Sequence, residues 1–230
     1  MRPTVLLFDI DGTLVTTGGV GRRALELAFE RAYGRPDACS GFRLDGMTDR
    51  AIVRGGLVAL GVAPSQTTID AVLGGYLEVL AEEVAAAPAE KYRVHAGICE
   101  TLDAAAGHRH FAIGLGTGNI REGARIKLER VGLFRRFGFG GFGNDDEDRT
   151  ALLRMGAERG ATVLGMVLED VRVVVIGDTP KDVAAARGIG AESVGVGTGS
   201  FSAEELRGVG ATWAFPSLAF PGAMEAVLGA

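Results

Sequence analysis

The sequence predicts an α/β fold in which a parallel sheet is interrupted by an inserted, all-helical domain. Two observations carry this prediction. Beyond residue 95, apolar strands alternate with amphipathic helices, which is the pattern of βαβ units in a parallel sheet. Before that point, three helical stretches follow a single N-terminal strand with no other strand between them. A helical layer therefore separates the first strand from its sheet partners.

The first strand is the run Val5-Leu6-Leu7-Phe8, which has the apolar character of a strand buried in a parallel sheet. Apolar residues at helical spacing then predict three helices, and Thr48 is placed to cap the second. These helices are expected at about residues 20–33, 48–60 and 65–87. We assign residues 15–91 to the helical domain, and residues 1–14 and 92–230 to the core.

The second half of the chain supplies the remaining strands, of which the apolar run at residues 171–176 is the clearest. Trp213 and Phe215 are expected to pack a late strand. Strands are predicted at about residues 111–115, 137–142, 171–176 and 193–196, and helices at about 98–106, 119–131, 150–159 and 182–187.

Composition excludes several classes of protein. With 47% hydrophobic and 23% charged residues among 230, the chain has enough apolar material for a full globular core. A net charge of -5 without a Lys/Arg cluster argues against nucleic acid as a partner. The N-terminal apolar run is too short for a signal peptide or a membrane span, and two cysteines without metal-ligand spacing fit a reducing compartment. We expect a cytoplasmic monomer or homodimer.

The stretch from Asp9 to Leu14, with the sequence DIDGTL, directly follows the first strand. It brings two carboxylates to the carboxyl edge of the sheet, where open α/β folds bind their ligands. Asp9 and Asp11 point in different directions, so that one can attack while the other handles protons. Gly12 lets the backbone turn sharply and bring an amide close to an anion. Asp and Gly are also ordinary turn residues, so the motif indicates a catalytic site only if other strands of the sheet end in acidic residues as well.

Two more strand ends carry suitable residues. Asp178 ends the apolar strand before it, and Asp182 lies in the first turn of the next helix, where an acidic residue also suits the helix dipole. Thr117 precedes a helix, where a hydroxyl and free amides form an anion site or a simple cap. Asp9, Asp11 and Asp178 can converge on a hard cation such as Mg²⁺. Together these groups fit phosphoryl transfer.

With these residues the chain resembles the haloacid dehalogenase-like (HAD) phosphohydrolase superfamily, over essentially its whole length. Within it, the chain is similar to the phosphoglycolate phosphatase-like and β-phosphoglucomutase-like branch. Three motifs carry the resemblance, namely DxDGTL at residues 9–14, Thr117 with Gly118-Asn119, and GDTxxD at residues 177–182. The resemblance implies a Rossmann-like three-layer core, with the helical insertion as its cap domain.

The resemblance also implies roles. Asp9 would attack phosphorus, and Asp11 would protonate the leaving group and then activate water. Thr117, with the amides near Gly12 and Gly118, would hold the phosphoryl oxygens. The implied Mg²⁺ ligands are the Asp9 side chain, the Asp11 backbone carbonyl, Asp178, and Asp182 directly or through water.

In the helical domain, the segment Gly46-Met47-Thr48-Asp49 looks like the part of the cap that faces the substrate. Arg43 and Arg50 are candidates to contact an anionic leaving group. The substrate-binding residues expected on these grounds are Gly12, Gly118, Asn119, Thr48, Asp49 and Arg50.

One motif departs from the family pattern. The family places a basic residue, usually Lys, before the helix after the third strand, and here the candidate is Arg149. An arginine can bind phosphate bidentately but differs from lysine in reach and geometry. Lys127 belongs to the helix after Thr117 and is expected to face solvent, as most helical lysines do.

The leading hypothesis is therefore a Mg²⁺-dependent phosphatase for a small phosphomonoester, either phosphoglycolate-like or a sugar phosphate. A sugar-phosphate mutase uses the same residues and stays open, as does a non-catalytic protein on this fold. Asp11 argues against a true haloacid dehalogenase. A phosphonatase would need a cap lysine to form a Schiff base, and no lysine occurs before Glu90.

Overall fold

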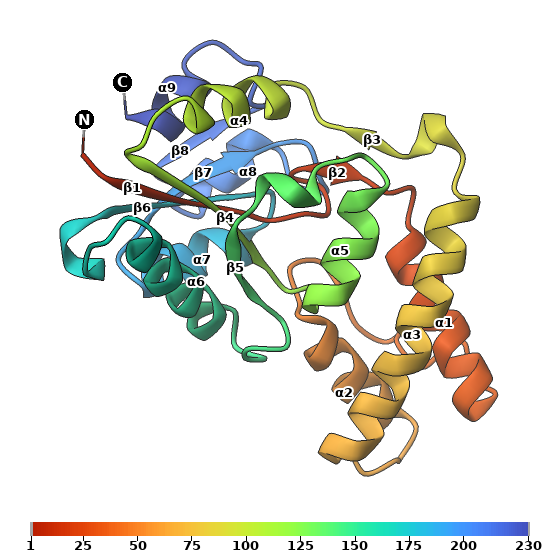
Figure 1. Cartoon of the computed structure of the whole chain (residues 1–230). Helices are drawn as coiled ribbons and strands as arrows, with labels where there is room; N and C mark the ends of the chain where they lie inside the picture. The colour runs from red at the N-terminus through yellow and green to blue at the C-terminus, as the bar shows by residue number, and fades with distance from the viewer. Residues whose placement is uncertain (1, 230) are drawn as a thin grey trace.

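The computed structural model describes residues 2–229 and contains a six-stranded, wholly parallel sheet (Figure 1). The strand order is β5-β4-β1-β6-β7-β8, so the N-terminal strand lies near the centre of the sheet. The strands are β1 (Thr4–Phe8), β4 (Phe111–Thr117), β5 (Phe139–Phe142), β6 (Arg172–Gly177), β7 (Glu192–Val196) and β8 (Trp213–Phe215).

Helices cover both faces of the sheet. Because side chains alternate along a strand, Leu6 and Phe8 pack on one face of β1, while Val5 and Leu7 pack on the other. The first face is covered by α4 (Ile98–Ala106), α5 (Arg121–Glu129) and α9 (Ala223–Leu228), and the second by α6 (Arg149–Val163) and α7 (Pro180–Gly188). A shorter helix, α8 (Ala203–Gly208), packs beside β7 and β8.

The predicted helical insertion lies to one side of the sheet, below and to the right in Figure 1. It consists of α1 (Val20–Tyr33), α2 (Asp49–Ala59) and α3 (Gln66–Ala86), which share a hydrophobic cluster of their own. An antiparallel ribbon joins it to the core, formed by β2 (Val15–Thr16) and β3 (Arg93–Val94). Short 3₁₀ turns lie at Ala89–Lys91, Phe134–Arg136 and Leu168–Asp170.

The predicted α/β class, a three-layer Rossmann-like core with a helical insertion, is confirmed. The helices α1 and α4 begin and end at the residues that the sequence pattern predicts. β5 begins only at Phe139, two residues after the predicted start, and a 3₁₀ turn ends just before it at Arg136. Within residues 2–229, none of the helices combines the length and apolar character needed to cross a membrane.

Candidate active site

The polar residues of the site lie where three adjacent strands end. Phe8 of β1 pairs with Leu115 of β4 on one side and with Ile176 of β6 on the other, so the three carboxyl ends lie level. Asp9 therefore lies between Thr117 and the residue that follows β6, Asp178. The strand ends thus lie together, but the Asp11 carboxylate, which was expected to converge with those of Asp9 and Asp178, pairs with Lys127 and lies outside the carboxylate cluster.

Three carboxylates form a buried cluster. One oxygen from each of Asp9, Asp178 and Asp182 lies within 4.8 Å of the other two. Burial, together with the negative charge of the neighbouring carboxylates, raises the pKa of Asp9 to about 6 and that of Asp178 to about 8. The raised pKa values show that the ionised carboxylates are destabilised by burial and by one another. A metal cation would offset their negative charge, so the cluster is suited to bind one.

Local structure fixes the orientation of these carboxylates. The Thr13 hydroxyl donates to Asp178 at 2.9 Å. Asp182 forms a capping box at the start of α7, where its Oδ2 accepts from the amide and the hydroxyl of Thr179 at 3.0 and 2.8 Å. Gly12 has a φ of 80°, and a side chain there would collide with Asp178. The tight turn after β1 thus requires glycine.

Arg149, at the first position of α6, reaches into the acidic cluster. Its Nη2 lies 3.0 Å from Oδ2 of Asp9 and in direct contact with Oδ1 of Asp182. Its Nη1 donates to the carbonyl of Gly46 at 3.4 Å, which connects the cluster to the helical insertion. Burial opposes its charge, but the carboxylates outweigh this effect and raise the pKa of Arg149 above its usual range. Arg149 is therefore a buried cation in contact with two of the three clustered carboxylates.

Asp11 faces a different set of partners from Asp9. Its Oδ2 accepts from Lys127 Nζ at 2.6 Å and from Asn119 Nδ2 at 3.0 Å, and its Oδ1 accepts from the Thr17 hydroxyl at 3.4 Å. Burial acts to raise the pKa of Asp11, but the Lys127 ammonium outweighs it and lowers that pKa. The two carboxylates of the DIDGTL motif thus have separate environments, as the sequence predicts.

Thr117 and its neighbours complete the floor of the site. Thr117 is fully buried, it acts to lower the pKa of Asp9, and its hydroxyl oxygen accepts from the backbone and side-chain amides of Asn119 at 3.2 and 3.0 Å. Gly118 lies directly beneath Met47 and Thr48, where a side chain would collide with the backbone. Thr117 and Asn119 are therefore positioned next to the two catalytic candidates of β1.

Comparison with known proteins agrees with this arrangement. Residues 6–187 match the sequence profile of the haloacid dehalogenase-like hydrolases. The chain belongs to this family. No curated protein matches it in sequence.

Solved structures share the fold of this HAD family member over nearly the whole chain. CbbY from Rhodobacter sphaeroides, in complex with phosphate, superposes with a TM-score of 0.71 at 18% identity, over 96% of this chain and 97% of that one. A hydrolase from Pseudomonas syringae gives 0.70 at 19% identity, over 95% of both chains. The β-phosphoglucomutase from Clostridium difficile gives 0.70 at 16% identity, over 95% of this chain and 92% of that one. At these identities the likeness concerns the fold.

The expectation that Lys127 of this HAD chain faces solvent is wrong. Its side chain is only 4% exposed, and its Nζ also donates to Oδ1 of Asn119 at 2.6 Å. The buried side of α5 carries Gly123, Ala124, Lys127 and Leu128. Lys127 therefore shares a helix face with two small residues and a leucine, and this signal was available in the sequence.

The cap segment approaches the core through Thr48 and Asp49. The Thr48 side chain caps α2 by accepting from the Ala51 amide, and its hydroxyl donates to the Glu147 carbonyl at 3.2 Å. The Asp49 amide donates to the Gly118 carbonyl at 2.8 Å, and its Oδ2 accepts from the Ile120 amide at 2.9 Å. Residues 48 and 49 thus contact the loop that follows Thr117.

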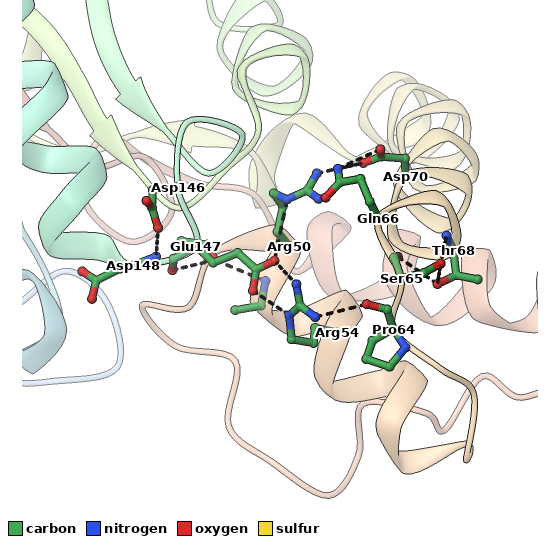
Figure 2. A network of polar contacts seen from close by, with 12 residues as sticks. Arg50, Arg54, Pro64, Ser65, Gln66, Thr68, Asp70, Asp146, Glu147 and Asp148 are labelled. Atoms are coloured by element: carbon green, nitrogen blue, oxygen red, sulfur yellow. Dashed lines mark hydrogen bonds and ion pairs between the residues drawn. The ribbon is translucent and has the colours of Figure 1, made fainter.

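The structure places neither Arg43 nor Arg50 against Asp9. Arg50, whose side chain is only 13% exposed, donates to Asp70 of α3 at 2.8 Å (Figure 2), and Arg43 is exposed beside Asp45. Arg54 instead makes a bidentate pair with Glu147, with both N–O distances at 2.8 Å (Figure 2). This pair links α2 to the acidic loop that leads into Arg149.

A cavity of about 380 Å³ lies between the HAD core and the helices of the insertion. From the core, Asp9, Asp11 and Arg149 line it, and from the insertion, Asp49 and Tyr76. Asp11 reaches the cavity with a side chain that is 41% exposed. A molecule in this cavity would touch both predicted catalytic carboxylates.

The raised pKa of Asp178 predicts a pH-dependent stability of the metal-free protein. The unfolded carboxyl ionises near pH 3.8, whereas the folded one keeps its proton up to about pH 8. Stability is therefore lost as the pH rises through this window. Asp178→Asn cannot ionise, so we expect it to raise the melting temperature at pH 9 in EDTA by several degrees, at roughly 2–4 °C per kcal/mol.

At pH 4, where the folded Asp178 keeps its proton and the unfolded carboxyl is only about half ionised, the same variant should differ much less from the unmodified protein. Thermal melts at the two pH values measure the difference. Asp170→Asn, at an exposed carboxylate, is the matched control. An equal shift of the Asp178→Asn variant at pH 4 and pH 9 would contradict the assignment.

Proposed function

We propose that this HAD family member is a Mg²⁺-dependent phosphatase that hydrolyses a small phosphomonoester through an aspartyl-phosphate on Asp9. The observation that carries the proposal is the position of Asp9. Its buried carboxylate directly follows β1, lines the cavity, and contacts Arg149 at 3.0 Å. A carboxylate held this way can act as a nucleophile toward phosphorus.

The first step transfers the phosphoryl group. An oxygen of Asp9 forms a bond to phosphorus while the bond from phosphorus to the leaving oxygen breaks, and Asp11 gives a proton to that oxygen. The Arg149 guanidinium and the Thr117 hydroxyl lie beside Asp9 and offset the negative charge of the phosphoryl oxygens. The Asp11 carboxylate faces the cavity, where the leaving group would lie.

The second step releases the product. Asp11 takes a proton from a water molecule, the water oxygen bonds to phosphorus, and the bond from phosphorus to Asp9 breaks. Inorganic phosphate leaves, and both carboxylates return to their starting forms. Lys127 lowers the pKa of Asp11, which favours the ionised form that this step needs and disfavours the protonated form from which the first step starts.

The residues present fit a divalent cation. The donor set is made of oxygen atoms only, and its buried carboxylates repel one another, which a cation would relieve. Asp9, Asp178 and Asp182 would hold the ion, and the Asp11 backbone carbonyl is a further proposed ligand. When bound, Mg²⁺ neutralises charge on the phosphoryl oxygens.

A substrate panel with and without metal tests this function. We expect the purified protein to release inorganic phosphate from p-nitrophenyl phosphate and from at least one small metabolite-like phosphomonoester in Mg²⁺. Turnover should fall by about 100-fold or more in EDTA. Chloropropionate, as a haloacid, should yield no chloride. Isomerised sugar phosphate without release of phosphate would favour a mutase, and absence of all turnover would contradict the proposal.

A further inference from the structure

The cavity wall beyond Asp11 carries three buried polar groups that have hydrogen-bonding atoms to spare. Asp49 comes from the start of α2, Tyr76 from the middle of α3, and Lys127 from α5. All three line the cavity, on the side that the helices cover. None of them is needed to hold the phosphoryl group.

Tyr76 is the clearest of the three. The residue is almost fully buried, at 1% exposure, yet its hydroxyl makes no hydrogen bond to any residue between 2 and 229. A hydroxyl that borders a cavity and has no partner in the protein is free to bond to a polar group placed there. The position of the hydroxyl thus points to a polar ligand.

Asp49 and Lys127 line the same cavity, and each can make a further hydrogen bond. The Oδ2 of Asp49 accepts from the Ile120 amide, whereas its Oδ1 has no hydrogen bond within the described part of the chain. Lys127 can donate three hydrogen bonds and uses two, to Asp11 and Asn119. The wall therefore offers an acceptor, a donor, and a hydroxyl that can do either.

The space between these groups stays open because residue 21 is glycine. A β-carbon on Gly21 would lie 3.2 Å from Nζ of Lys127 and 4.0 Å from the Tyr76 hydroxyl. Both polar atoms therefore border the same volume at the first turn of α1. A ligand group of a few atoms can reach both from there.

The charges on this wall do not suit an acidic leaving group. The ammonium of Lys127 is already matched by Asp11, at 2.6 Å, and by the field of Asp49. Arg43 and Arg50 are paired with Asp45 and Asp70 and do not line the cavity. Arg22, which does line it, is exposed to solvent. A carboxylate in this part of the cavity would meet two like charges and no unmatched buried cation.

We propose that Asp49, Tyr76 and Lys127 form a subsite for the hydroxyl groups of the leaving group. The substrate class is then the phosphomonoester of a neutral polyol or sugar, and a carboxylated ester such as phosphoglycolate is disfavoured. This inference rests on the proposed phosphatase function. The subsite takes the place of the contact with an anionic leaving group that was expected from Arg43 and Arg50.

The test compares glycerol 3-phosphate with n-propyl phosphate, which has the same carbon chain without hydroxyls, and with 2-phosphoglycolate. We expect kcat/KM for glycerol 3-phosphate to exceed the other two by about tenfold or more, since each hydrogen bond contributes about 0.5–1.5 kcal/mol. In Tyr76→Phe the ratio of glycerol 3-phosphate to propyl phosphate should fall about fivefold. Tyr33→Phe, which removes a hydroxyl from the far end of α1, is the matched control and should keep the ratio.

The outcomes separate the two proposals. Absence of turnover with every phosphomonoester would overturn the phosphatase function and the subsite with it. Turnover of propyl phosphate at the rate of glycerol 3-phosphate, or a preference for 2-phosphoglycolate, would overturn the subsite and leave the phosphatase intact. A Tyr76→Phe ratio equal to that of the unmodified protein, with an unchanged melting temperature, would do the same.

Discussion

Asp9→Asn is expected to lower kcat for phosphate release by about 10⁴-fold or more, since an amide cannot form the covalent intermediate. Asparagine has nearly the same size and shape, so the turn after β1 is preserved. The change also removes one charge from a cluster of buried, mutually repelling carboxylates. The variant should therefore melt at the same temperature as the unmodified protein, or higher.

Steady-state phosphate release and thermal melts measure the two effects together. Asp170→Asn makes the same chemical change at an exposed position and should retain full turnover. More than a tenth of the original kcat in a folded Asp9→Asn protein would rule out this residue as the nucleophile. The phosphoryl group would then have to be accepted elsewhere.

Arg149→Met is expected to cause the second-largest loss, about 10³-fold in kcat/KM. Among the described residues, Arg149 is the one cation in contact with Asp9, and it also contacts Asp182. Its removal leaves buried carboxylates without a partner, which costs about 3–5 kcal/mol of stability in the absence of metal. Both kcat/KM and the melting temperature should fall.

Arg149→Lys separates charge from geometry. The lysine restores a cation near Asp9 but not the second contact of the guanidinium fork. We expect it to recover most of the stability and to remain about tenfold below the unmodified kcat. If Arg149→Met folds and keeps kcat/KM within threefold of the original, the guanidinium has no part in the transition state.

The sequence predicted the core elements well because their ends carry strong local signals. The first helix lies between Gly19 and Gly34, both of which adopt a positive φ, and glycines at these points are visible in the sequence. Asp9, Thr117 and Asp178 could be placed together because parallel strands end at one edge of the sheet. No side-chain geometry was needed for that step.

The cap face of the site was harder to predict, since it depends on how two separately packed units meet. Arg50 and Asp49 are neighbours on the same helix, yet only Asp49 faces the cavity, and the sequence does not say which way α2 is turned. Lys127 was misjudged for a related reason. Its partner, Asp11, lies 116 residues away in the chain, and the pairing exists only once α5 is packed against the sheet.

The paired β2–β3 ribbon has a consequence for how the molecule folds. The chain leaves the core at Thr16 and returns at Arg93, which is its hydrogen-bonded neighbour. For the sheet, the whole insertion is one closed loop, and the entropy lost in closing a loop grows only with the logarithm of its length. Lengthening or shortening the insertion therefore changes the entropic cost of pairing β1 with β4 very little. The same change would alter the side of the cavity that would contact the leaving group.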